Sequence, residues 1–117
     1  MGARPDSPET LRMQLGLLLP SFIVDCYDPE LLPPEEDEPE TFHRVMREFT
    51  YSFGKAASSL SMAQLQKIGN LVNDAVGYSD DLENAVATCF LEHLHQVHAL
   101  KVLWPYLSPK ARAECYA

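Results

Sequence analysis

The chain has 117 residues, 46% of them apolar and 22% charged, which is the composition of one globular domain. Its 17 acidic residues outnumber its 9 basic ones, and the formal net charge of −8 argues against direct binding to nucleic acid. Three cysteines without a CxxC motif do not suggest a disulfide framework, and no apolar run approaches the roughly 18 residues of a membrane span. The first eight residues do not resemble a signal peptide, so we expect one helical domain over residues 1–117, located in the cytoplasm.

The first predicted helix begins at Ser7-Pro8-Glu9, which combines an N-cap serine, a proline at the first helical position and an acid in the first turn. Pro20 lies near the end of this helix. Residues 21–27 are too few for their periodicity to distinguish a second helical turn from a short extended piece. The buried side of the first helix is predicted to carry four leucines: Leu11, Leu15, Leu18 and Leu19.

An acidic, proline-rich segment at residues 25–40 follows. Eight acidic residues fall within it, which equals the whole net charge, and no Lys or Arg occurs from residue 13 to residue 43. Four prolines oppose helix formation, so we predict a long loop between the first helix and the next long one. Loops of this length in a compact domain are typically functional or disordered, and a solvated linker without a binding role is the alternative interpretation.

This acidic segment predicts a binding function. Carboxylates spaced along an extended chain would attract a basic surface, such as the substrate groove of a nuclease, through long-range electrostatic steering. Tyr27 could supply packed contact with the partner, whereas Leu31 and Leu32 either do the same or attach the loop to the domain. The predicted partner-binding residues are Asp25, Tyr27, Asp28, Glu30, Glu35, Glu36, Asp37, Glu38 and Glu40.

A second long helix is predicted over residues 41–57. Arg44 and Arg47 lie away from its apolar side, where they could fold back on the acidic segment or face solvent. Helical spacing places five large apolar residues on one stripe, which we expect to form the centre of the core: Phe42, Val45, Met46, Phe49 and Phe53.

The third and fourth helices are predicted to form an antiparallel hairpin. The capping box Ser61-x-x-Gln64 begins the third helix, and Gly77 occupies the place of a left-handed C-terminal cap. Ser79 is predicted to cap a fourth helix that extends to about residue 97. This helix is apolar around most of its circumference, which predicts a central position or a partner contact. Its apolar residues are Leu82, Ala85, Val86, Cys89, Phe90, Leu91, Leu94 and Val97.

The C-terminal part continues as helix or turn over residues 99–107, interrupted by Pro105, and Ser108-Pro109 begins a short final helix. No segment shows the strict alternation of a β-strand. The sequence therefore predicts an all-α fold, a compact bundle of about five or six helices with a long acidic Pro-rich loop.

The sequence gives little support for a catalytic or metal-binding site. The spacing of Glu92 and His95 matches half of a di-iron carboxylate site, but the chain has no second copy of that motif. His93 is predicted to be a hydrogen-bonded core residue, with His95 and His98 on the surface. Nucleophile and phosphate-binding motifs are absent from the sequence, so we expect no catalysis, no cofactor and no metal, and an enzyme using Glu92, His95 and His98 is the weakest alternative.

The segment 81–94, which reads D-L-E-N-A-V-A-T-C-F-L-E-H-L, supports a resemblance when taken with the preceding helix. Over about residues 60–95 the chain resembles a helical pair of small bacterial proteins, some of which look like immunity partners of secreted toxins. The pattern is also similar to a HEAT-type hairpin. The resemblance implies a small cytosolic inhibitor that binds and blocks one toxin, and the acidic segment predicts that this toxin domain has a basic surface. The alternative is a helical adaptor or regulatory subunit of a larger bacterial assembly, with the apolar arc of the fourth helix as a homodimer interface.

Overall fold

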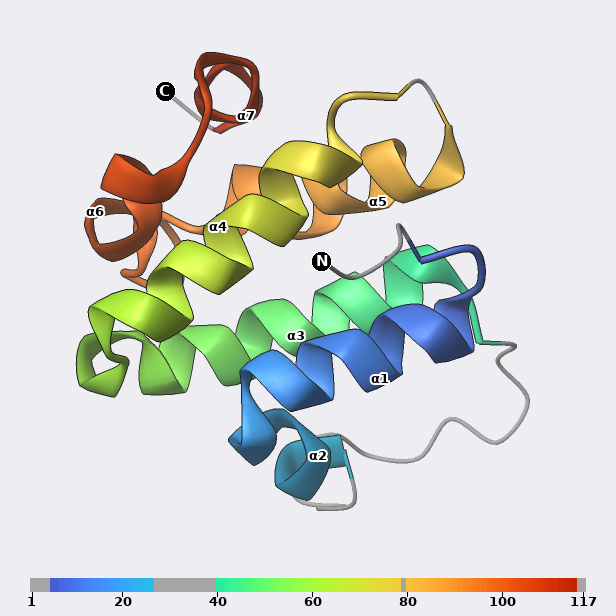
Figure 1. Ribbon diagram of the computed structural model, residues 1–117, viewed down its shortest axis with the longest axis horizontal. Helices are drawn as coiled ribbons and strands as arrows, with labels where there is room; N and C mark the ends of the chain where they lie inside the picture. Colours follow the sequence, from blue (N-terminus) through green and yellow to red (C-terminus); the bar gives the residue numbers. More distant parts are fainter. Residues whose placement is uncertain (1–4, 27–39, 79, 116–117) are drawn as a thin grey trace.

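The computed structural model describes residues 5–26, 40–78 and 80–115, and within these ranges all regular structure is helical (Figure 1). The predicted all-α fold is confirmed, with seven α-helices in the described residues where about five or six were expected. The α-helices are α1 (Pro8–Leu18), α2 (Pro20–Cys26), α3 (Phe42–Ala56), α4 (Met62–Ala75), α5 (Asp81–Cys89), α6 (Leu100–Leu103) and α7 (Pro109–Glu114). Three short 3-10 helices accompany them: η1 (Ala57–Ser59), η2 (Leu91–His93) and η3 (Trp104–Tyr106).

Most helix starts are set by local side-chain caps, as predicted. The Ser7 hydroxyl accepts a hydrogen bond from the backbone N–H of Thr10, and Ser108 caps α7 in the same way. Ser61 and Gln64 form the complete reciprocal capping box at the start of α4. Residues 21–26, whose type was left open, are helical and belong to α2.

The connection between α4 and α5 differs from the prediction in two respects. Val76 is the C-cap of α4, and Gly77 does not adopt a left-handed conformation. Asp80, rather than Ser79, caps α5, because its Oδ1 accepts the N–H of Glu83 at 3.0 Å. Ser79 itself lies outside the described residues. Helices α4 and α5 are in contact, but α5 packs more extensively on α3 than on α4.

The predicted long fourth helix is wrong beyond Cys89. Phe90 has φ −120° and ψ −66°, and the chain turns there into η2. The Thr50 hydroxyl lies 2.6 Å from the Cys89 carbonyl oxygen and 2.7 Å from that of Met46, and its single hydrogen is donated to one of these two acceptors. This turn lets Phe90, Leu91 and Leu94 all enter the core, where each is fully buried. The apolar arc is therefore core, and no observation supports a homodimer interface there.

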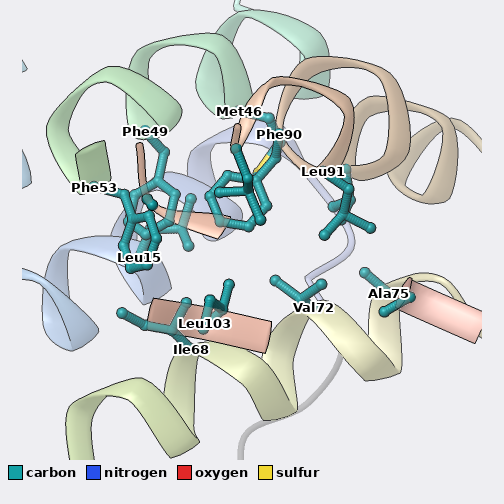
Figure 2. Packing of buried hydrophobic residues seen from close by; sticks show 14 of the residues in the cluster. Leu15, Met46, Phe49, Phe53, Ile68, Val72, Ala75, Phe90, Leu91 and Leu103 are labelled. Atoms are coloured by element: carbon teal, nitrogen blue, oxygen red, sulfur yellow. The ribbon is translucent and has the colours of Figure 1, made fainter. Parts of the chain in front are cut away.

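Four fully buried phenylalanines form the centre of the core, and Figure 2 labels three of them, Phe49, Phe53 and Phe90. Phe49 of α3 contacts the other three rings, with centroids 5.3 Å from Phe22, 6.0 Å from Phe53 and 5.6 Å from Phe90. Edge-to-face and offset arrangements of this kind stabilise a core beyond simple area burial. The predicted apolar stripe of α3 is thus confirmed as the centre of the domain. Leu15 of α1 and Ile68 of α4 close the cluster on two other sides.

Helices α1 and α3 lie side by side and run in the same direction (Figure 1). The end of α2 is bound to Lys55 near the C-terminal end of α3, whereas residue 40 lies two positions before the first residue of α3. The 15 residues of α3 span about 22 Å, so the connection must join points that far apart. Two parallel helices cannot be joined by a tight turn, and a long segment between α2 and α3 is therefore a requirement of the topology.

Helix α4 holds the C-terminal region through one short face. The Asn73 amide donates to the carbonyl oxygen of Tyr106 at 3.0 Å and accepts from the N–H of Ser108 at 2.8 Å. Gly69 lies one turn earlier on the same side, and a Cβ added there would lie 2.7 Å from that Tyr106 oxygen. The absence of a side chain at this position allows η3 to reach the backbone of α4.

We predict that Gly69→Ala lowers the free energy of unfolding by about 1–3 kcal/mol, since the clash with a backbone atom outweighs the better helix propensity of alanine. Gly77→Ala is the matched control, because Gly77 has no positive φ and the nearest atom to its added Cβ would be 3.2 Å away. We expect the control to change stability by less than about 1 kcal/mol. Urea denaturation measures both, and a Gly69→Ala variant as stable as the parent would contradict this packing.

Candidate partner-binding surface

The nine predicted partner-binding residues divide into two groups. Asp25 and Glu40, at the two ends of the acidic segment, are described. Seven others lie outside the described residues: Tyr27, Asp28, Glu30, Glu35, Glu36, Asp37 and Glu38. The structure therefore defines how the segment is attached to the domain at each end.

Asp25 attaches the first end. It is buried near the C-terminal end of α2, and its Oδ1 accepts a hydrogen bond from Lys55 Nζ at 2.9 Å. The Lys55 ammonium also lies 5.5 Å from the centroid of the Tyr51 ring, a cation–π distance. The second carboxylate oxygen of Asp25 is buried without a hydrogen bond in the structure. Asp25 thus turns into the protein and joins α2 to α3.

Glu40 attaches the second end through Arg12. The Arg12 Nη2 donates to Glu40 Oε1 at 2.6 Å, and Nε lies 3.3 Å from Oε2, so the guanidinium grips both oxygens. Its Nη1 donates to Glu48 Oε1 at 2.9 Å, and its Cζ lies 5.6 Å from the centre of the Phe22 ring. Glu48 also accepts from Arg44, four residues earlier on α3. One arginine of α1 therefore connects α2, α3 and the end of the acidic segment.

The two attachments divide the acids of the segment into a neutralised pair at its ends and six others between them. Both described acids are neutralised by cations of the domain, Lys55 for Asp25 and Arg12 for Glu40. By sequence, the other six of the eight acids lie between residues 28 and 38. Sequence reasoning missed Arg12, Glu48 and Lys55. The available signal was Arg12 itself, which is the last basic residue before 31 residues without Lys or Arg and lies beside buried Leu11.

An exposed apolar surface lies on the outer side of α1 and α2. Its members are Met13, Leu17, Ile23 and Val24, with exposed fractions of 63%, 75%, 49% and 69%, and we call them the α1–α2 face. Ile23 lies against the α1 backbone, because a Cβ added at Gly16 would be 2.7 Å from its Cγ1. No charged residue occurs from residue 13 to residue 24. The two helices thus each expose uncharged apolar side chains, and Ile23 joins α2 to the backbone of α1.

The histidines do not form a site in the described residues. The predicted core position of His93 is wrong: the side chain is exposed and its Nδ1 lies 2.8 Å from Gln96 Oε1, because α5 ends before it. His95 is half-buried, and His98 is exposed with a positive φ of 59°. Within residues 5–26, 40–78 and 80–115, no three His, Cys, Asp or Glu side chains are placed to hold a metal ion.

Side-chain surroundings are described for two cysteines. Cys89, one of the apolar residues of the predicted fourth helix, is half-buried at the end of α5, and Cys115 is buried after α7. Burial raises the pKa of the Cys115 thiol above its ordinary value, and the neighbouring Glu114 carboxylate adds to this shift. A thiol with a raised pKa is a poor nucleophile at neutral pH.

Residues 23–117, well over half of the chain, match the family model described as a domain of unknown function (DUF7674). The chain belongs to the DUF7674 family. No curated protein and no solved structure gives a significant match to it. The DUF7674 match begins inside α2, although Leu11 and Leu15 of the preceding α1 are buried in the same core. In the described part of this DUF7674 member, no helix is long and apolar enough to cross a membrane.

We predict that Arg12→Ala lowers the free energy of unfolding by about 1.5–3 kcal/mol, since it leaves two half-buried carboxylates without their shared donor. Arg12→Lys should recover less than half of this loss, because an ammonium cannot reproduce the guanidinium fork. Lys67→Ala, which removes an exposed cation of α4, should stay within about 0.5 kcal/mol of the parent. Denaturant titration of all three variants measures these differences. Equal losses of unfolding free energy for Arg12→Ala and Lys67→Ala would contradict a stabilising role of the Arg12 ion pairs.

The raised pKa of Cys115 predicts a specific dependence of stability on pH. Above about pH 8.5 the unfolded chain loses the thiol proton while the folded chain retains it, so the stability due to this group falls as pH rises. The parent should therefore lose more unfolding free energy than Cys115→Ala between about pH 8 and about pH 10. Denaturation under reducing conditions at several pH values tests this, and parallel curves for the two proteins would refute it.

Proposed function

We propose that the protein binds and blocks a partner with a basic surface, in the manner of an immunity protein that neutralises a bacterial toxin, and that it acts without catalysis. The observation that carries the proposal is the attachment of the acidic segment at both ends by internal ion pairs. Asp25 with Lys55 and Glu40 with Arg12 hold these ends at opposite ends of α3.

The distribution of charge supports this proposal. Outside residues 25–40 the chain carries nine acidic and nine basic residues, so the negative charge is concentrated in one segment. The cations nearest the ends of that segment are already paired with Asp25, Glu40 and Glu48. The six acids between residues 28 and 38 would then attract a basic surface and accelerate association.

The size and class of the protein also fit a blocking role. Tight inhibition needs an interface of about 800 Å² per partner, which a domain of 117 residues can supply. A groove that binds nucleic acid or a nucleotide carries the basic charge that this segment would complement. The resemblance of residues 60–95 to a helical pair of small bacterial proteins, some of which look like immunity partners of toxins, points to the same class. The protein would meet its toxin in the cytoplasm.

We predict that Glu35→Lys, Glu36→Lys, Asp37→Lys and Glu38→Lys together abolish capture of a salt-sensitive partner while leaving the fold intact. The four reversals change the net charge by +8, from −8 to 0. Tagged protein incubated with lysate of its own source, at low and high salt, should retain one stoichiometric protein with a basic domain. With that protein purified, the reversed variant should associate at least about tenfold more slowly at low salt.

A matched control carries the same change in net charge elsewhere, through reversal to Lys of four exposed acids: Asp74, Asp81, Glu92 and Glu114. This control should retain most of the association rate, because steering depends on where the charge lies as well as on its sum. Equal slowing of association in both variants would mean that the net charge of the protein, and not the position of the acidic segment, determines the association rate. Unchanged binding by the segment variant at low salt would refute the proposed mechanism.

A further inference from the structure

The α1–α2 face has no role in the fold that accounts for its composition. Eight large apolar side chains are exposed among the described residues, and four of them form this face, within residues 13–24. Leu17 and Val24 are about three-quarters and two-thirds exposed, so neither contributes much to the core. Helix positions of this kind accept polar residues without loss of stability. A concentrated apolar surface on a small domain is typical of a binding site.

The four side chains of the face are uncharged. Arg12 is directed at Glu40 and Glu48, and Asp25 is buried against Lys55. The exposed acid Glu9 lies one helical turn before Met13 on α1. Contact with the four side chains is therefore apolar, with negative charge at the edge of the face.

The charge of the adjoining sequence indicates whether the α1–α2 face binds a second copy of the chain or a different protein. Val24 is followed at once by the acidic segment, with six acids between residues 28 and 38. Two copies of the chain joined through this face would bring two such segments together, and like charges would oppose that dimer. A partner with basic residues beside its apolar surface would be attracted instead. The charge pattern thus favours a different, basic partner over a second copy.

We propose that the α1–α2 face binds an amphipathic helix of the partner, whose apolar stripe is flanked by Lys or Arg. Met13 and Leu17 are one helical turn apart on α1, which is 11 residues or about 16 Å long and matches three turns of a docked helix. Apolar side chains of the partner at positions i, i+3, i+4 and i+7 would pack on this face. The proposal rests on the proposed function, since it identifies which part of a basic partner makes the apolar contact.

The test uses a synthetic helical peptide of about 18 residues, with leucines on one stripe and lysines on both flanks. A control peptide of identical composition has the leucines spread around the helix, so that only its charge matches. Fluorescence anisotropy measures binding of both to the full chain at about 0.05 M and about 0.5 M salt. We expect at least about tenfold tighter binding of the stripe peptide, with the preference retained at high salt.

Variants assign the preference to the face. Leu17→Gln with Val24→Gln should remove the preference for the stripe peptide without lowering the melting temperature, whereas Met62→Gln, an exposed apolar position on α4, should keep it. Equal binding of the two peptides to the parent, or a preference that survives in the double variant, would overturn the proposal. A parent dimer that the double variant dissociates, seen by sedimentation, would also overturn it in favour of a second copy.

The charge-reversed variant at residues 35–38 separates this proposal from the proposed function. If it binds both peptides as the parent does, while Leu17→Gln with Val24→Gln removes the preference, the apolar face stands and the acidic mechanism fails. If the charge reversal weakens the binding of both peptides, and the double variant binds both as the parent does, the acidic mechanism stands. The binding role of the α1–α2 face is then refuted.

Discussion

The contact of Phe49 with three other phenylalanines is the interaction on which the rest of the domain depends. Its ring contacts Phe22 from α2, Phe53 from α3 and Phe90 from the end of α5. Phe22 must therefore remain beside α3, which requires α2 to fold back under α1. Phe90 must leave the line of α5, which requires the helix to end at Cys89. The same aromatic cluster thus determines both where one helix stops and where the acidic segment has to start.

Electrostatic attachment follows from this packing. With α1 and α2 held on α3 by apolar contacts, Arg12 lies above the Phe22 ring and faces Glu40 and Glu48. Lys55 meets the buried Asp25 near the other end of α3. Because half-buried pairs are less screened by solvent than exposed ones, both attachments should persist at physiological salt. The uncharged α1–α2 face and the acidic segment are then two distinct surfaces carried by the same two helices.

Local features could be predicted from the sequence, and long-range ones could not. Ser7, Ser61 and Ser108 were identified as caps because a cap depends on residues within one turn. The end of α5 was missed because the spacing of Phe90, Leu91 and Leu94 fits either one long apolar helix or a bent chain, and only tertiary packing decides between them. Asp25 and Glu40 were identified from their charge, but their cations lie 30 and 28 residues away in sequence. No local pattern connects such pairs.

The position of α1 has a consequence for the minimal folding unit of the family. The DUF7674 match starts at residue 23, yet Leu11 and Leu15 belong to the same core as the aromatic cluster and Arg12 forms an ion pair with Glu40. A polypeptide cut at the family boundary would expose that cluster to water and leave Glu40 without its described counter-ion. Any relative that begins at that boundary must cover the same surface with another element, and the autonomous folding unit of this chain includes α1.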